Sequence, residues 1–353
     1  MALPAIVVDV GFVNGLAALR SLGAAGVETI AVDHRRSALG FRSRYGRRVL
    51  APSPLDDEEG FVAALRGVGP AVVFPTHDEG LRAIARHRDE LEVRCPFPRD
   101  VERLQRKRVQ LEAAADAPET RFPATAAEAR AAADELGYPV LVKPSEPVGF
   151  RQAHGVQALR CATAREVEEA FPLVEPFEPM VQELIPGADD TLFTLGAYLS
   201  ESLEPLGLFC GRKLRQTPPG VGTARVAEAV WVQDVVDAGL ELLRALECTG
   251  LSQVEFRRDP RDGGFKLMEV NPRLWQWHSL ARACGVDLPL LAYRDLAGER
   301  VEPVRMNGRR RRWSIALMPH ERPAVLRPPF VEATFAWSDP KPALVHAARV
   351  LRA

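Results

Sequence analysis

The chain has 353 residues, with 46 Lys and Arg against 47 Asp and Glu, so its formal net charge at pH 7 is −1. This balance argues against nucleic-acid binding, and a hydrophobic content of 46% argues against disorder and fibres. No apolar run reaches membrane-spanning length, the start lacks a signal-peptide pattern, and five scattered cysteines without a CxxC pair suit a reducing compartment, so we expect a cytoplasmic protein without a membrane partner.

The first residues predict a β-α-β unit. An apolar run, AIVVD at 5–9, is followed by the glycine-bearing turn GFVNG, a helical pattern and a second run, TIAVD. A further run, AVVF at 71–74, leads through the polar turn PTHDE into another helix. We therefore predict a Rossmann-like α/β domain, with both turns at the carboxyl edge of a parallel sheet, where open sheets bind ligands. At that edge Asp78 and Glu79 are suited to hold a substrate ammonium, although a helix N-cap explains Asp78 nearly as well.

The middle of the chain predicts helices followed by strands. A helical stretch over 101–117 precedes a second helix that ends at Gly137. The strand PVLVKP then leads into a loop over 145–155, which resembles a long hairpin connection to VQALR. Strands dominate the following part of the chain, apart from a helix over 230–250.

The most informative chemical pattern is a predicted hairpin, VEF and LMEVNPR joined by the turn signal DPRDGG. Because strand side chains alternate, Glu269 and Asn271 point to one face with Glu255 opposite them, while Met268 faces an apolar layer. Two carboxylates and an amide oxygen are hard ligands suited to Mg²⁺. On the same side, Arg273 is suited to hold a phosphate bidentately.

Glu255 followed by MEVNPR resembles the metal-binding hairpin of the ATP-grasp superfamily. PVLVKP resembles the superfamily's strand that carries the nucleotide lysine, and VQELIPG resembles its adenine hinge. The opening GFVNGLAALRSLGAAGV, the SRY motif and FPTHDEGLRAIARHRDEL look like the pre-ATP domain of the D-aspartate ligase-like, carbamoyl-phosphate-synthetase-like branch. The resemblance implies a Rossmann-like pre-ATP-grasp domain followed by an ATP-grasp fold, whose two α+β subdomains grip ATP.

On this resemblance we expect four parts. They are a pre-ATP-grasp domain at 1–95, a small or lid subdomain with a linker helix at 96–182, a large subdomain with the metal hairpin at 183–300, and a tail packing on the body at 301–353. The implied cofactors are ATP and Mg²⁺, the latter as two ions that Mn²⁺ can replace, with Glu255, Glu269 and Asn271 as metal ligands.

The resemblance also implies a nucleotide site. Lys143 would lie against the α and β phosphates, and Lys107 is the candidate for an earlier nucleotide lysine, with a merely basic helix face as the alternative. Glu183 and Ile185 would contact adenine through main-chain groups, and Asp190 would bind the ribose hydroxyls. The full set of expected nucleotide-binding residues is Lys107, Lys143, Ser145, Gly149, Gly155, Gln182, Glu183, Leu184, Ile185 and Asp190.

In the family a mobile Gly/Ser-rich loop closes over the phosphates. Here the corresponding segment has only Gly149 and Gly155 as glycines, with Ser145 and His154 as polar groups. We expect Ser145, Gly149 and Gly155 to contact the phosphates and His154 to be an ordinary loop residue.

A basic strand, RKLR, follows. The resemblance implies that basic residues of this strand hold the γ phosphate or the acyl phosphate. Lys213 and Arg215 share one face of this strand, because successive side chains alternate. Together with Arg273 they are the expected catalytic residues. Trp275 and Trp277 follow the hairpin and either shape the acceptor pocket or pack in the core.

The resemblance implies an ATP-dependent carboxylate-amine ligase, acting on an amino acid or peptide, that forms a C–N bond through an acyl phosphate and releases ADP and phosphate. Its partners are then a small-molecule carboxylate and an amine, and family members often form homodimers. The alternatives are a kinase or carboxylase of the same fold, a non-catalytic ATP-binding regulatory protein, and a dinucleotide-dependent oxidoreductase, for which the GFVNG turn lacks GxGxxG. The residues do not identify the acid, the amine or a general base.

Overall fold

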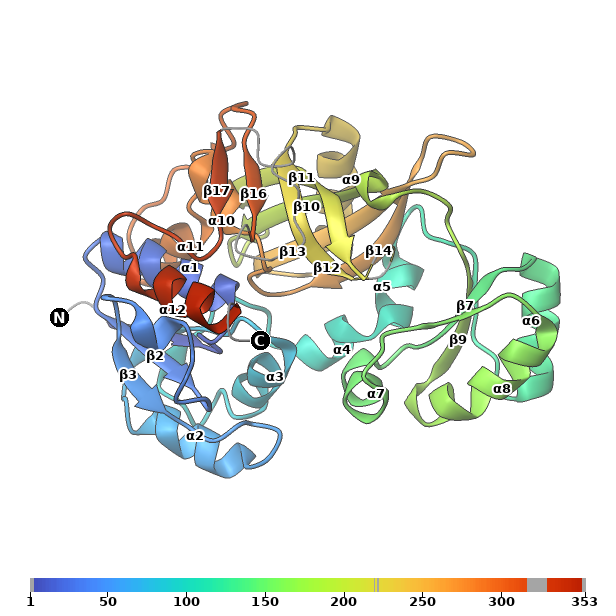
Figure 1. Cartoon of the computed structure of the whole chain (residues 1–353), viewed down its shortest axis with the longest axis horizontal. Helices are drawn as coiled ribbons and strands as arrows, with labels where there is room; N and C mark the ends of the chain where they lie inside the picture. The colour runs from blue at the N-terminus through green and yellow to red at the C-terminus, as the bar shows by residue number, and fades with distance from the viewer. Residues whose placement is uncertain (1–2, 219, 221, 316–328, 351–353) are drawn as a thin grey trace.

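The structure, a computed structural model, describes residues 3–218, 220, 222–315 and 329–350, with side chains as far as residue 348. Across this described part three sheets organise the chain (Figure 1). Within the same residues, no helix is long and apolar enough to cross a lipid bilayer.

The N-terminal sheet is parallel, which confirms the predicted Rossmann-like unit. Its strands have the order β3-β2-β1-β4-β5, and β1, β2 and β4 are buried throughout, as expected of strands covered by helices on both faces. The strand order runs outward in opposite directions from β1 and from β4, so the connections after these two strands lie on opposite faces of the sheet. A crevice therefore forms at their carboxyl ends. The elements are β1 (Ala5–Val8), α1 (Val13–Ala24), β2 (Thr29–Asp33), the 3-10 turn η1 (Gly40–Arg42), β3 (Arg47–Leu50), α2 (Glu58–Arg66), β4 (Ala71–Phe74), α3 (Asp78–Arg86) and β5 (Val93–Arg94).

A four-stranded antiparallel sheet forms a lid, seen at the right of Figure 1. Its strands have the order β6-β9-β7-β8, and the helices α6 and α8 pack together and against the sheet. The elements are β6 (Thr120–Arg121), α6 (Ala126–Leu136), β7 (Val140–Pro144), β8 (Leu159–Cys161), α8 (Ala164–Val174), η2 (Glu175–Phe177) and β9 (Pro179–Glu183).

Between β7 and β8 the chain forms helix α7 (Pro147–His154), so the prediction of a loop here is wrong. Pro147 lies in the first turn, where its missing N–H costs nothing. The carboxylate of Glu146 accepts from the N–H of Gly149 (2.9 Å), and the helix ends at Gly155, whose φ is 70°. An N-cap residue, a proline in the first turn and a glycine in the left-handed conformation at the end are local signals for a helix. They outweigh the similarity of this segment to a hairpin loop.

The helical stretch predicted over 101–117 is interrupted at Arg106, whose ψ of 120° is extended. The second helix therefore begins at Lys107, whose N–H donates to Ser145 O (3.0 Å). The hydroxyl of Ser145 accepts from the N–H of Arg108 (3.1 Å), so the lid fixes the start of this helix. The two helices are α4 (Val101–Gln105) and α5 (Lys107–Ala113).

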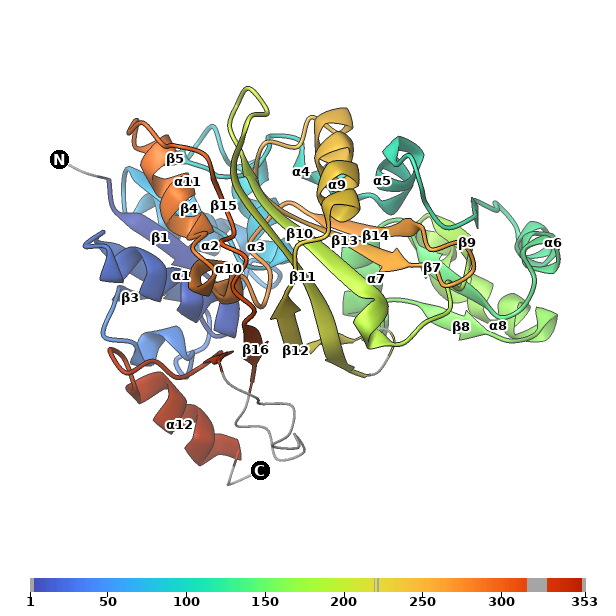
Figure 2. The ribbon, with the colours of Figure 1, turned by 90° about the horizontal axis from the view of Figure 1, so that it is seen from above.

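A third, largely antiparallel sheet has eight strands among the described residues, in the order β14-β13-β10-β11-β12-β16-β17 with β15 beside β11. Helices α9 and α11 pack against β10, and Figure 2 shows α9 above the sheet. The predicted hairpin is present as β13 and β14. The elements are η3 (Asp189–Thr191), β10 (Leu192–Leu199), β11 (Pro205–Thr217), β12 (Thr223–Ala229), α9 (Gln233–Ala245), β13 (Gly250–Arg258), β14 (Phe265–Asn271), α10 (Ser279–Ala283), α11 (Leu288–Leu296), β15 (Val304–Arg305), β16 (Arg312–Ser314) and β17 (Phe330–Glu332).

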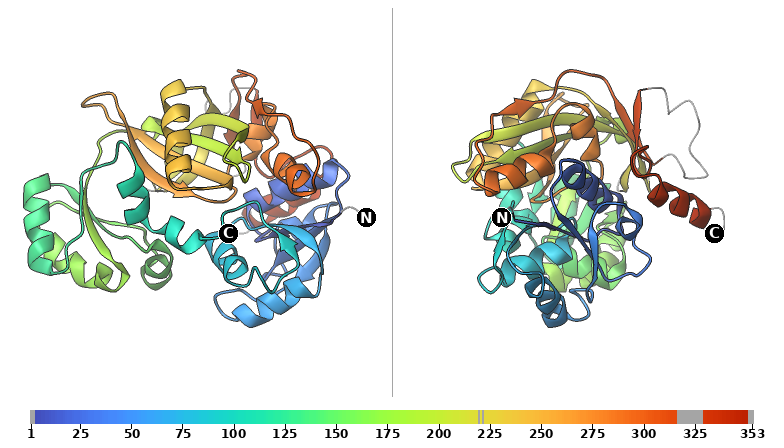
Figure 3. Two further views of the ribbon diagram at one scale, coloured as in Figure 1. Left: turned by 180° about the vertical axis from the view of Figure 1, so that it is seen from behind. Right: turned by 90° about the vertical axis from the view of Figure 1, so that its left-hand side faces the viewer.

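The C-terminal segment connects two of these parts. After contributing β15, β16 and β17 to the eight-stranded sheet, it crosses to the N-terminal part, where α12 (Lys341–Val350) packs against η1 (Figures 1 and 3). In the arginine run, Arg312 lies in β16 and forms an ion pair with Glu228 of β12 (3.5 Å).

A glycine in β10 sets the position of the chain that follows the hairpin. The indole of Trp275 lies against Gly196 so closely that a Cβ at position 196 would be 2.0 Å from Trp275 Cη2. Because Trp275 is only 2% exposed, sheet and indole form one packed unit.

We expect Gly196→Ala to destabilise the protein by about 1–3 kcal/mol, the usual cost of overpacking a core. The measurement is the midpoint of urea unfolding at unchanged m-value. Gly67→Ala is the control, since a Cβ there would meet nothing closer than 3.5 Å. Equal midpoints for the two variants would contradict the packing described.

Candidate functional site

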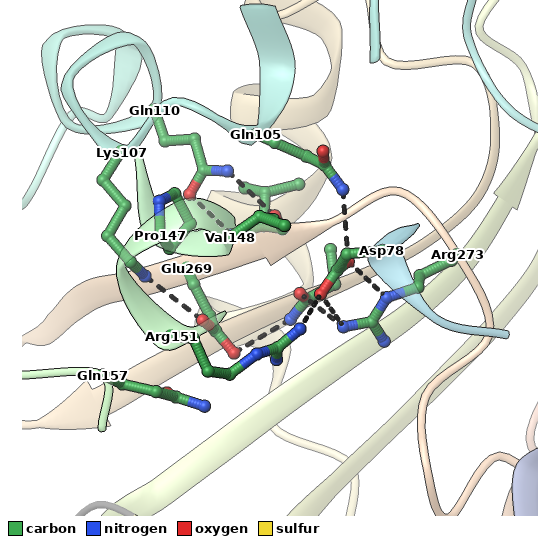
Figure 4. A pocket seen from close by; sticks show the side chains of 12 residues that line it. Asp78, Gln105, Lys107, Gln110, Pro147, Val148, Arg151, Gln157, Glu269 and Arg273 are labelled. Carbon is green, nitrogen blue, oxygen red and sulfur yellow. Dashed lines mark hydrogen bonds and ion pairs between the residues drawn. The ribbon is translucent and has the colours of Figure 1, made fainter. Parts of the chain in front are cut away.

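A cavity of about 650 Å³ lies where the three sheets meet. Residues at the carboxyl edge of the N-terminal sheet, in β7 and β9 of the lid, and in β11 to β14 of the large sheet line it. A recess of about 70 Å³ adjoins it, lined by α5, α7 and the end of β14 (Figure 4).

Two carboxylates face each other on the hairpin at the centre of the cavity. Glu255 of β13 is paired in register with Glu269 of β14. Lys213 Nζ lies 2.9 Å from Glu255 Oε1, and Lys107 Nζ lies 3.2 Å from Glu269 Oε2 (Figure 4 shows the second pair). The two lysines come from β11 and α5, so elements far apart in the chain supply one cation to each carboxylate.

Burial and charge act on these two carboxyl groups in opposite directions. Burial raises the pKa of Glu255, and Lys213 only partly offsets it. Burial also disfavours the charged form of Glu269, but Lys107 and the hydrogen bond from Asn271 hold its pKa below the usual range. The charged form of Glu255 is therefore the less stable of the two, and a divalent cation bound beside it would stabilise that form.

The amide of Asn271 completes this face of the hairpin. Its Nδ2 donates to Glu269 Oε1 (2.9 Å), and its Oδ1 accepts from Arg273 Nη2 (3.2 Å). To act as a metal ligand beside Glu269, the side-chain amide of Asn271 has to rotate so that Oδ1 takes the place of Nδ2. Two carboxylates and an amide oxygen would fit an ion such as Mg²⁺, which keeps waters and takes ligands from phosphates. The described residues contain no group of three or more His, Cys, Asp and Glu side chains that could hold a metal ion.

Arg273 is held by the N-terminal part. Its Nε and Nη2 donate to Asp78 Oδ1 (2.7 Å) and Oδ2 (3.1 Å), a bidentate pair that fixes the guanidinium plane (Figure 4). Burial opposes the charge on Asp78, yet Arg273 holds the pKa of this carboxyl below its usual range. Burial and the nearby Arg273 lower the pKa of His77 to about 3, so His77 is neutral near pH 7.

Ion pairs join helix α7, which lines the recess, to helix α3. Arg151 Nη2 donates to Glu79 Oε1 (2.7 Å) and lies 3.6 Å from Asp78 Oδ2. Arg82 Nη1 lies 2.7 Å from Glu146 Oε1 at the start of α7. Asp78 and Glu79, expected to hold a substrate ammonium, are therefore both paired with arginines here.

Lys143 lies inside the cavity wall on β7. It is 9% exposed, and its Nζ donates to Gln182 Oε1 (2.7 Å). Burial, and then repulsion from Lys107, lower its pKa to about 7. A lysine that is half neutral near pH 7 gains a full charge when an anion approaches.

The predicted adenine hinge follows β9 along the cavity wall. Gln182, Glu183, Leu184 and Ile185 all line the cavity. Arg257 of β13 is 7% exposed, and its Nη1 donates to Ile185 O (3.4 Å), which fixes the hinge to the large sheet.

One predicted catalytic residue is misplaced. A β-bulge in β11 shifts the register between Lys213 and Arg215, so the two side chains do not share a face. Lys213 and Gln216 line the cavity, whereas Arg215 does not. The argument from strand alternation is therefore wrong for Arg215.

Four predicted nucleotide contacts lie outside the cavity lining. Ser145 is fully buried beneath α5, and Gly149 and Gly155 belong to the first turn and the end of α7. Asp190 is exposed; its neighbour Asp189 instead accepts from the N–H of Gln216 (2.9 Å). The glycines are separated from the cavity because their segment is a helix.

Some cavity residues were missed. Met268 lines the cavity, not an apolar layer, because a bulge opposite Glu255 and Phe256 makes it the extra residue in β14. Gln253 lies two positions before Glu255 and donates to its Oε1 (2.9 Å). Strand alternation was a signal for Gln253 and Arg257, but none was present for Met268.

Comparisons with known proteins agree with this geometry. The family model described as carbamoyl-phosphate synthase L chain, ATP binding domain, matches residues 224–303, which include the hairpin. The carbamoyl phosphate synthase large chain of Methanothermobacter thermautotrophicus is 26% identical over 198 residues, 53% of this chain and 18% of that protein. The D-aspartate ligase of Enterococcus faecium is 28% identical over 146 residues, 38% of this chain and 34% of that protein.

A solved structure shows the same fold. Biotin carboxylase of Campylobacter jejuni, in a complex with β,γ-ATP, has a TM-score of 0.68 at 16% identity, covering 85% of this chain and 72% of that one. The matched regions of the two curated relatives span 18% and 34% of their lengths, so this chain corresponds to only part of each. The chain therefore has the fold of the ATP-grasp structures, and parts of its sequence are similar to the carbamoyl-phosphate synthase large chain and to D-aspartate ligase.

Proposed function

We propose that this chain is an ATP-dependent carboxylate-amine ligase that forms an amide through an acyl phosphate. The observation that carries the proposal is the facing pair Glu255 and Glu269 in a cavity that also contains Lys107, Lys143 and Lys213. Two carboxylates and three lysine side chains around one cavity are suited to bind a nucleoside triphosphate together with a divalent cation.

The nucleotide lies between the lid and the large sheet in this proposal. The hinge at Glu183 to Ile185 contacts adenine through main-chain groups, and Lys143 and Lys107 lie beside the phosphates. Glu255 and Glu269 would hold Mg²⁺, together with Asn271 once its side-chain amide has rotated to direct Oδ1 at the ion. Bound there, Mg²⁺ would neutralise charge on the phosphates during transfer.

The chain's cations then act on the reacting groups. A carboxylate oxygen of the acid attacks the γ phosphorus, ADP leaves, and Lys213 and Arg273 stabilise the charge that develops. The amine next attacks the acyl carbon, phosphate leaves with the bonding electrons, and the amine loses a proton. The acyl phosphate reacts readily with water, so the position of α7 over the recess, fixed by Arg151 and Glu79, has a protective function.

The direct test is a pyruvate-kinase-coupled screen of ADP release with amino acids, dipeptides and bicarbonate, singly and in pairs. We expect release that needs both an acid and an amine, and transfer of one ¹⁸O atom from a labelled carboxylate to phosphate. Glu269→Gln should lower turnover at least about a hundredfold, because it removes a metal ligand and its charge. Glu112→Gln, on the exposed face of α5, is the matched control.

Three results would contradict the proposal: release that never needs an acceptor, phosphate without ¹⁸O, or normal turnover by Glu269→Gln. ADP release with bicarbonate as the only added acid would instead favour the carboxylase alternative. Biotin carboxylase has the same fold, which is why bicarbonate is included in the screen.

The buried amine of Lys143 predicts proton uptake when the nucleotide binds. With its pKa lowered to about 7, Lys143 is mostly neutral at about pH 8, and phosphate oxygens beside it raise that pKa again. A Mg²⁺ complex of a non-hydrolysable ATP analogue should therefore take up nearly one proton at about pH 8 and almost none at about pH 6, and its affinity should fall as the pH rises above 7.

Isothermal titration in buffers of different ionisation enthalpy measures this uptake. Lys143→Arg should abolish it, because a guanidinium stays charged, whereas Lys266→Arg at the ion pair with Asp116 should leave it unchanged. Equal uptake by the Lys143→Arg variant would show that the nucleotide phosphates do not lie beside this side chain.

A further inference from the structure

One end of the cavity is enclosed by residues from the C-terminal segment. Ile315, directly after β16, and His346 of α12 both line it, as do Phe12 and Leu39 at the carboxyl edge of the N-terminal sheet. These residues are not part of the hinge, the lysine cluster or the hairpin. This region of the cavity, which we call the strap end, is therefore separate from the elements assigned to the nucleotide.

A buried ion pair fixes the segment that carries His346. Arg20 of α1 donates through Nε to Asp339 Oδ2 (3.0 Å), and the side chains are only 9% and 2% exposed. Ser43 Oγ donates to the same oxygen (2.7 Å), and the N–H of Arg44 donates to Asp339 Oδ1 (2.9 Å). A carboxylate satisfied by this many donors has one position, so α12 is held against the N-terminal part.

Ile315 is fixed independently through the large sheet. Its N–H donates to Arg225 O (3.4 Å), directly beyond the pairing of β16 with β12. The strap end therefore has one wall fixed to each of two parts of the molecule.

The strap end combines apolar and polar surface, because Arg225 also lines the cavity beside Ile315. Phe12 is 42% exposed, and its ring lies 4.0 Å from the ring of His77, which burial keeps neutral. Leu39, Ile315 and Trp277 add further apolar surface. The only carboxylates among the described lining residues are Glu183, Glu255 and Glu269, which belong to the hinge and the hairpin.

We infer that the strap end is the subsite for an apolar, bulky side group of the acid or amine substrate, with Ile315 and His346 in contact with that group. The inference rests on the proposed function, which makes the ligand an acid or amine substrate. It adds the substrate class, namely amino acids with aromatic or branched aliphatic side chains. A hydrophobic wall of this kind favours such ligands, because burying an apolar side chain there removes its surface from water.

The test measures binding, so it does not depend on turnover. Protein loaded with ADP and Mg²⁺ is titrated calorimetrically with phenylalanine, leucine, glutamate and lysine, each as both enantiomers. We expect at least one enantiomer of phenylalanine or leucine to bind at least about tenfold more tightly than glutamate and lysine, a difference within reach of burying one apolar side chain.

Two variants locate the binding. Ile315→Trp should weaken binding of the apolar probe at least about tenfold by filling the subsite, and His346→Ala should weaken it about three- to tenfold by removing contact surface. Leu344→Trp, at a position of α12 that is 67% exposed, is the matched control. The affinity for ADP should stay within about twofold of wild type in all three, which also shows that each variant is folded.

Preferred binding of glutamate or lysine, no binding of any apolar probe, or unchanged affinity in both variants would overturn the inference. The proposed function fails by a different result, namely apolar binding that is never accompanied by ADP release.

Discussion

Glu255 and Glu269 face each other across the hairpin, and the rest of the site is arranged around their charge. Two neighbouring carboxylates in a buried place repel each other and lose hydration, so they are stable only with cations beside them. Lys213 of β11 and Lys107 of α5 supply those cations at 2.9 and 3.2 Å. A break in the linker helices and a hydrogen bond to Ser145 place Lys107 there. The hairpin, the linker and the lid are thus joined through one pair of acids.

Ion pairs extend from this pair to the N-terminal part. Asp78 at the start of α3 fixes Arg273 bidentately, and Arg151 of the lid helix α7 reaches the same acidic turn. These side chains are only partly exposed, so their geometry is restrictive, although their net contribution to stability is modest. The network joins helix α7 and Arg273, the arginine proposed to act on the phosphate, to one acidic turn of the N-terminal part.

The sequence predicted the elements whose signals are local or repetitive, namely the parallel unit and the hairpin. It failed where one residue changes the register. Bulges in β11 and β14 turn Arg215 away and Met268 inward, and a bulge has no compositional signature. Capping residues make 147–154 a helix, although the resemblance favoured a loop. The strap end was beyond prediction, because Phe12 and residues more than 300 positions later line one cavity through tertiary packing alone.

The central claim is that the hairpin carboxylates bind the cation that contacts the nucleotide phosphates. A crystal structure with Mn²⁺ and a non-hydrolysable ATP analogue, with an anomalous difference map to locate the Mn²⁺, tests it most directly. The account predicts an anomalous peak in direct coordination distance of Glu269 and Glu255, with the phosphates on its other side and Lys143 beside them. A peak elsewhere, or phosphates at the glycine turn after β1 with no ion at the hairpin, would contradict it.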